Sequence, residues 1–80
     1  MILLDTREYD HPTPLEMAVD TFKTLNGSEV MHMIHRREPL PLFEIVRNQG
    51  GRHFSYQEAD GIWHIFITRD PELHLEQYRV

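Results

Sequence analysis

The apolar residues of the N-terminal third follow first a strand pattern and then a helix pattern. Residues 2–5 form a short apolar run that suits a buried strand. From Leu15 to Phe22, apolar side chains recur at the three- and four-residue intervals that lay one stripe along a helix. The pattern predicts a strand at 2–5 and a helix at about 14–25 that packs on a sheet.

The start of this helix carries several signals. Thr13 can serve as the N-cap, Pro14 suits the first helical position, and Glu16 stands at the third, which together make a capping box. Gly27 follows the last apolar position and can close the helix in the left-handed conformation. We therefore expect a helix whose N-terminus is stabilised by Thr13 and Glu16.

A second strand and a second helix follow. Residues 28–35 carry apolar side chains on both alternating faces, with Met31 and Met33 together on one of them. Apolar residues on both faces indicate an interior strand. Two prolines, Pro39 and Pro41, cannot lie inside a helix but are favoured in its first turn, so the second helix begins near one of them.

The next segments predict a hairpin. Residues 53–57 and 62–68 are rich in aromatic and β-branched side chains and flank Asp60-Gly61, a pair that favours the two-residue type I′ turn. Beyond them, the weak alternation of residues 72–80 is compatible with either an added strand or a frayed end.

The expected element order is β-α-β-α-β-β, in one domain at residues 1–69 followed by a C-terminal tail at 70–80. A chain of 80 residues supports one modest core, and its 40% hydrophobic and 26% charged content is that of a globular domain. The N-terminal apolar run ends at Asp5, too early for a signal peptide or a membrane span. We expect no membrane association and a cytoplasmic location.

The charge and the absence of cysteine exclude several function classes. The formal net charge of −5 would repel a polyphosphate, so nucleic acid is not an expected partner. Without cysteine, the chain cannot form disulfides, carry a persulfide, attack with a thiolate or bind a metal through sulfur. Six histidines are unusual for this length, and neutral imidazole is a common metal ligand.

Three stretches of the sequence resemble a known family. Leu4–Glu8, His11–Glu16 and Pro39–Phe43 are similar to the cysteine-lacking branch, composed of uncharacterised proteins, of the SirA/TusA-like family. The resemblance covers roughly residues 3–69 and implies an α+β two-layer sandwich, with a mixed four-stranded sheet and both helices on one face. Sulfur-carrying members place a reactive cysteine where this chain has His11, and imidazole cannot hold a sulfane sulfur. The resemblance therefore implies a carrier scaffold that is not itself a sulfur carrier.

His11 is the first candidate for a functional residue. A side chain just before a helix lies near unpaired backbone N–H groups, and the positive end of the helix dipole disfavours a protonated imidazole. Together with Pro12, Thr13 and Glu16, it defines the expected binding loop. The alternative is a polar loop residue that only fills the space of the missing cysteine.

Two further groups are weaker candidates. Arg36 and Arg37, next to the second helix, can bind a small anion or a partner's carboxylate, or can form an ordinary solvated turn. A metal site would require His11 and His35 to converge with a carboxylate such as Asp10 or Glu38.

The remaining strand histidines are expected to be structural. His32 and His35 are three positions apart in one strand, so they point to opposite faces and cannot bind the same ion. His53 and His64 lie on the hairpin strands, where a half-buried polar role is the usual one.

Two functions from different classes follow. The first is a non-enzymatic binding or protein-interaction module that presents the His11 loop to another protein or to a second copy of the chain. If one sheet face is uncovered, Met31, Met33 or Phe66 would add an apolar patch to this surface. The second is a metal-binding protein, structural or redox, centred on His11 and His35. His11 as the general base of an enzyme is a third idea, for which the sequence offers no catalytic partner.

Overall fold

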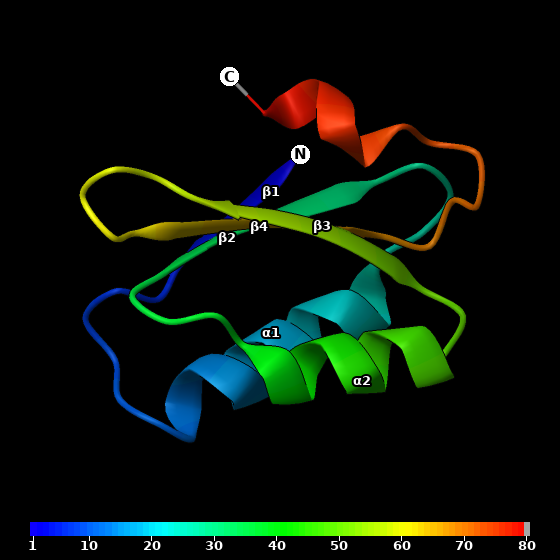
Figure 1. The fold of residues 1–80 in the computed structure, drawn as a ribbon. Coiled ribbons are helices and arrows are strands. Elements are labelled where there is room, and N and C mark those ends of the chain that lie inside the picture. Colours follow the sequence, from blue (N-terminus) through cyan, green and yellow to red (C-terminus); the bar gives the residue numbers. More distant parts are fainter. Residues whose placement is uncertain (80) are drawn as a thin grey trace.

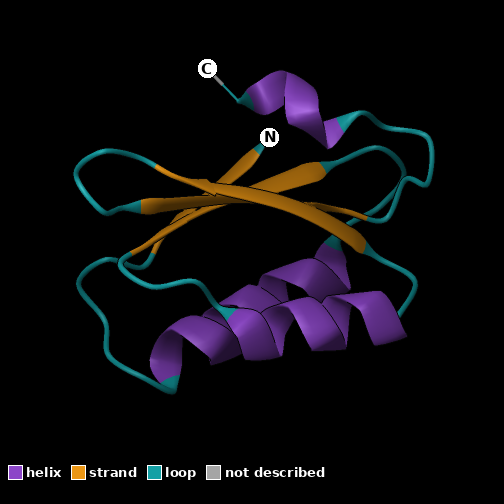
Figure 2. Ribbon diagram, in the orientation of Figure 1, coloured by secondary structure: helices purple, strands orange, loops and turns teal. Residues whose placement is uncertain are grey.

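Residues 1–79, which the computed structural model describes, form four strands, two α-helices and a short 3₁₀-helix. The strands are β1 (Ile2–Asp5), β2 (Val30–His35), β3 (Arg52–Gln57) and β4 (Trp63–Thr68). The helices are α1 (Thr13–Thr24), α2 (Leu40–Asn48) and the 3₁₀-helix η1 (Leu75–Tyr78). The order of strands and α-helices is the one predicted, and Figures 1 and 2 show how they are arranged.

The strands form a single mixed sheet in the order β1-β2-β4-β3. β1 pairs with β2 in parallel, whereas β4 runs antiparallel to both of its neighbours. Both α-helices cover one face of the sheet, and η1 lies on the opposite face (Figure 1). The predicted α+β sandwich, with a mixed four-stranded sheet and two helices on one face, is confirmed.

The main core lies between the sheet and the two α-helices. The apolar stripe predicted for α1 is confirmed, because Ala18 and Phe22 are fully buried. Met31 and Met33 of β2 point into the same layer and are also fully buried. None of the described helices is long and apolar enough to cross a membrane.

The C-terminal tail builds a second, smaller core on the other face. Leu75 of η1 is buried together with Val30 and Phe66, and Tyr78 stacks on the Phe66 ring with the ring centroids 5.1 Å apart. The described part of the tail therefore packs on β3 and β4 instead of adding a strand to the sheet.

This packing removes the apolar patch expected on the sheet. Met31 and Met33 are 0% exposed beneath the helices, and Phe66 is 3% exposed beneath the tail. The expectation that these residues would form an exposed apolar patch on one sheet face is wrong. The sequence pattern correctly showed apolar side chains on both faces, but it did not show that the tail covers one of them.

The capping box predicted at the start of α1 is also wrong. Thr13 is already helical, Pro12 occupies the N-cap, and no side-chain hydrogen bond caps this end among the described residues. The Thr13 N–H donates to the Asp10 carbonyl at 3.0 Å, and the Glu16 N–H donates to the Pro12 carbonyl at 3.1 Å. Pro14 has no N–H, so this helix end has few donors left for a capping side chain to satisfy.

The hairpin between β3 and β4 has a longer loop than predicted. The strands pair as far as Gln57 and Trp63, and the Gly61 N–H donates to the Glu58 carbonyl at 2.9 Å. A type I′ turn needs a positive φ at both central residues, but only Gly61 of the Asp60-Gly61 pair has one, at 89°. The predicted two-residue turn is therefore wrong, although the hairpin itself is confirmed.

Candidate binding pocket

The loop before α1 and the loop before α2 converge at one end of the sheet. Because β1 and β2 are parallel, their C-terminal ends and the segments that follow them lie at the same end of the sheet. The Arg36 guanidinium joins the two loops by donating to the Asp10 carboxylate at 2.7 Å and to the Tyr9 carbonyl at 3.0 Å. This ion pair is exposed, so its role is to connect the loops more than to stabilise the fold.

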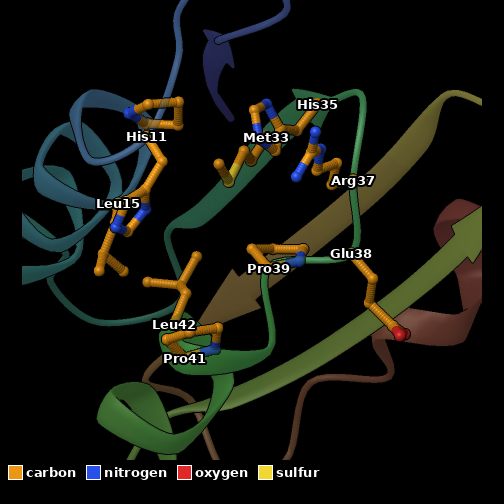
Figure 3. Close-up of a pocket in the computed structure, with 10 residues that line it drawn as sticks. His11, Leu15, Met33, His35, Arg37, Glu38, Pro39, Pro41 and Leu42 are labelled. Atoms are coloured by element: carbon orange, nitrogen blue, oxygen red, sulfur yellow. The ribbon is translucent and has the colours of Figure 1, made fainter.

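A pocket of about 180 Å³ opens between these loops (Figure 3). One wall comes from the start of α1, the floor from β2, and the other wall from the β2–α2 loop and the start of α2. The lining residues are His11, Pro14, Leu15, Met33, His35, Arg37, Glu38, Pro39, Pro41 and Leu42. The prolines, Leu15, Met33 and Leu42 make much of this surface apolar, and the two imidazoles and Arg37 add polar groups.

Thr6 holds the His35 imidazole in place from behind the pocket. Thr6 is completely buried, and its hydroxyl donates to the Ile34 carbonyl at 2.9 Å. The same hydroxyl oxygen lies 3.0 Å from His35 Nδ1. With the hydroxyl proton directed to Ile34, the Nδ1–H tautomer of the ring donates to the Thr6 oxygen and keeps its lone pair on Nε2.

The surroundings of His35 favour the neutral imidazole. Burial lowers the pKa of His35 below its usual value of 6.5, a hydrogen bond with the Thr6 backbone opposes this, and the nearby charges of Arg36 and Arg37 lower the pKa further. The ring is therefore uncharged at neutral pH, with one nitrogen available to accept a hydrogen bond or to bind a ligand.

The structure brings only some of the predicted site residues to this pocket. His11 lies on the wall opposite Arg37, next to Leu15 (Figure 3), while its neighbours Pro12, Thr13 and Glu16 do not line the pocket.

The arginine pair is divided in the same way. Arg37 lines the pocket, whereas the guanidinium of Arg36 is engaged by Asp10. The two arginines therefore do not form a joint anion site.

The proposed metal ligands are also only partly assembled. His11 and His35 share the pocket, but the part of the chain that the structure describes contains no group of three or more His, Asp or Glu side chains placed to hold one ion. The Arg36 hydrogen bond lowers the pKa of Asp10 and holds its carboxylate in the ion pair. Glu38 extends away from both imidazoles (Figure 3).

A second histidine arrangement, not expected from the sequence, lies on the other face of the sheet. His32 Nε2 is 2.9 Å from His64 Nδ1, and His64 Nε2 is 2.9 Å from the Glu58 carboxylate. His53, by contrast, stacks on Phe43 of α2 with the centroids 3.8 Å apart. The contact between His32 and His64 depends on the register of β2 against β4, and no local pattern in the sequence specifies that register.

Comparison with known proteins identifies a family and a fold. A family model described as "Uncharacterized conserved protein (DUF2249)" matches residues 3–69, and no curated protein matches the chain. Among solved structures, the chain is similar to a SirA-like protein from Desulfitobacterium hafniense at 16% identity and a TM-score of 0.76. The match covers 88% of this chain and 99% of that one. The expected SirA-like fold is therefore confirmed.

Proposed function

The chain belongs to the DUF2249 family of uncharacterised conserved proteins, and we propose that it is a non-enzymatic binding module that docks another protein at the pocket between its two helix starts. No thiol is present in the 80 residues, so the module is not itself a sulfur carrier. The partner would contact His11 on the pocket wall and Met33 and His35 on the pocket floor.

The observation that carries this proposal is the size and lining of the pocket. At about 180 Å³ it is smaller than the roughly 300–1,000 Å³ typical of sites for small molecules and cofactors. A single inserted side chain of a partner would fill it. Interfaces between proteins commonly depend on such an anchor residue in a well-packed pocket.

The polar groups around the pocket define which side chain fits. The apolar floor of Met33 and Leu42 suits an aliphatic or aromatic body, and Arg37 suits an acceptor at its tip or beside it. Neutral His35 adds a hydrogen-bonding nitrogen without a second positive charge. The expected partner therefore presents an apolar anchor next to a carbonyl or carboxylate.

Site-specific photo-crosslinking tests this proposal. A photoreactive residue at position 11 should capture a partner in living cells, and the same residue at the exposed position 44 on α2 should not.

An affinity measurement with the captured partner, once purified, is the second test. His11→Ala should weaken binding by about tenfold, the loss of more than 1 kcal/mol typical of a contributing interface residue. Because His11 is exposed, the thermal unfolding of the variant should match that of the wild type. Unchanged affinity for the partner would contradict the proposal.

A second candidate function is metal binding at His11 and His35. It is favoured by the neutral state of His35, whose Nε2 carries a lone pair in a pocket that also contains His11. Native mass spectrometry of untagged protein with zinc, copper or iron should then detect one ion per chain that is lost in His11→Ala. An ion retained by that variant would exclude this site.

A further inference from the structure

A groove between α1 and α2 is open to solvent. The two helices lie side by side on one face of the sheet (Figure 1), and the groove between them has a volume of about 440 Å³. Its lining residues are Leu15, Glu16, Val19 and Asp20 of α1 and Ile45 of α2. We propose that a positively charged amphipathic helix of the partner binds in this groove, with its C-terminal end at the pocket. This inference rests on the proposed function and defines the chemistry of the partner segment.

The floor of the groove is apolar and has the shape that a third helix fits. Leu15, Val19 and Ile45 are each half-buried, so they keep apolar surface that the fold does not cover. The side chains of a helix pack into the groove between two others through residues spaced at i, i+3, i+4 and i+7. α1 has 12 residues and a length of about 18 Å, so a partner helix of about three turns covers the groove.

The rim of the groove on α1 is negatively charged. Glu16 and Asp20 lie one turn apart, are exposed, and form no ion pair with any other described residue. Lys23 follows one turn after Asp20, beyond the lining residues. Arg47 is about 200° around α2 from Ile45, so it does not offset this charge. Lysine or arginine side chains on the partner helix complement the two carboxylates.

The groove leads into the pocket, because Leu15 lines both of them. α1 and α2 each follow one of two parallel strands, so both helices begin at the pocket end of the sheet and run in the same general direction. The C-terminal end of a helix carries unpaired carbonyls and a partial negative charge. At the pocket, Arg37 can donate to those carbonyls while an apolar side chain of the last turn enters. The partner helix therefore runs antiparallel to α1 and α2.

Titration of the full chain with a synthetic peptide tests the proposal. The probe is a peptide of about 15 residues, long enough to form helix in isolation, with leucine at the i, i+3, i+4 and i+7 positions and lysine elsewhere. By NMR it should shift the methyl resonances of Leu15, Val19 and Ile45, and leave those of Val30 and Leu75 in the tail-side core unchanged. The same peptide with glutamate in place of lysine should bind about tenfold more weakly. Equal binding of the two peptides, or no shift at the groove, would overturn the proposal.

Charge substitutions distinguish the rim from the general acidity of the chain. Glu16→Gln combined with Asp20→Asn should weaken binding of the lysine peptide about fivefold, the effect of losing two exposed ion pairs. Glu44→Gln combined with Glu72→Gln removes the same charge from exposed positions outside the groove and should leave the affinity nearly unchanged. Equal weakening by the two double variants would show non-specific attraction and would contradict the groove site.

Spin labels on the peptide test its orientation. A label at the C-terminus should broaden the resonances of His11 and Arg37 at the pocket. A label at the N-terminus should broaden those of Lys23 and Asn48, near the far ends of the two helices. The reverse pattern would overturn the proposed orientation.

Photo-crosslinking separates this inference from the proposed function. A photoreactive residue at position 20 in the groove should capture the same partner as one at position 11. Capture at position 11 alone would overturn the groove inference and leave the proposed function standing. Groove-specific binding of the peptide without capture at position 11 would support the groove and contradict docking at the pocket.

Discussion

The hydroxyl of Thr6 makes two contacts behind the pocket. It lies beyond the end of β1, it is fully buried, and it contacts both the Ile34 carbonyl, which also accepts from the Thr6 N–H, and the His35 ring. A hydrogen bond within a protein contributes about 0.5–1.5 kcal/mol, so this single oxygen links the stability of the loop to the orientation of a pocket residue.

Thr6→Val should therefore destabilise the protein by about 0.5–1.5 kcal/mol in urea denaturation, because valine has the same shape but cannot bond to the His35 ring or donate to Ile34. Thr21→Val is the matched control, since the Thr21 hydroxyl only bonds back to the Met17 carbonyl within α1. Equal destabilisation by the two substitutions would show that the Thr6–His35 contact contributes nothing specific.

The histidines that the fold keeps neutral should make stability depend on pH. Burial is the first cause that lowers the pKa values of His32, His35 and His53 below 6.5, so below that pH the unfolded chain binds more protons than the folded one. The stabilisation is complete above about pH 6.5 and is lost as the pH falls towards the folded-state pKa values.

Urea denaturation between pH 5 and 7.5 should accordingly show a free energy of unfolding that rises with pH, with a shallower slope in His35→Gln. A slope that is unchanged in this variant would mean that His35 is not responsible.

The carboxylates of Asp5 and Asp10 affect the free energy of unfolding in a separate pH range, below about pH 4. Hydrogen bonds from Arg7 and Arg36 lower their pKa values in the folded protein, to about 2 for Asp5.

At the scale of elements, the patterns that span several residues predicted more than the local signals did. The helix stripe ending at Phe22 and the alternation in β2 were correct because burial of a whole face determines them. The capping box and the type I′ turn were wrong because each depends on the φ and ψ angles of one or two residues. Neighbouring contacts, such as that of the Thr13 N–H with Asp10, decided those angles instead.

The tail was the element that the sequence described least well. Residues 75–78 form only one turn of helix, which is too short for a helical repeat of apolar residues to be visible in the sequence. Their contribution to the fold comes from one buried side chain. Leu75 is 1% exposed and closes the small core over Phe66.

Leu75→Ala should consequently destabilise the protein by about 2–5 kcal/mol, the usual loss when a buried leucine is removed. Leu40→Ala is the control, since Leu40 is 61% exposed and its truncation should change the free energy of unfolding by less than about 0.5 kcal/mol. A thermal unfolding experiment on both variants measures the difference, and similar melting temperatures would show that η1 does not stabilise the sheet.

At the scale of the whole molecule, the sequence indicated the fold and one member of each pocket wall. The sequence placed His11 before α1 and Arg37 before α2, and the parallel pairing of β1 and β2 brings those two loops together. Sequence reasoning missed Thr6 and the His32–His64 pair because both contacts join residues about thirty positions apart. Only the register of the sheet determines such contacts.

β2 supplies side chains to both faces of the molecule, with Met33 and His35 on the pocket side and His32 on the tail side. Side chains of a strand alternate, so the insertion or deletion of one residue within β2 would exchange its two faces. The pocket, the His32–His64 contact and both cores would then be lost together. We expect natural variation in chain length to be tolerated in the loops around β2 and to be absent within the strand itself.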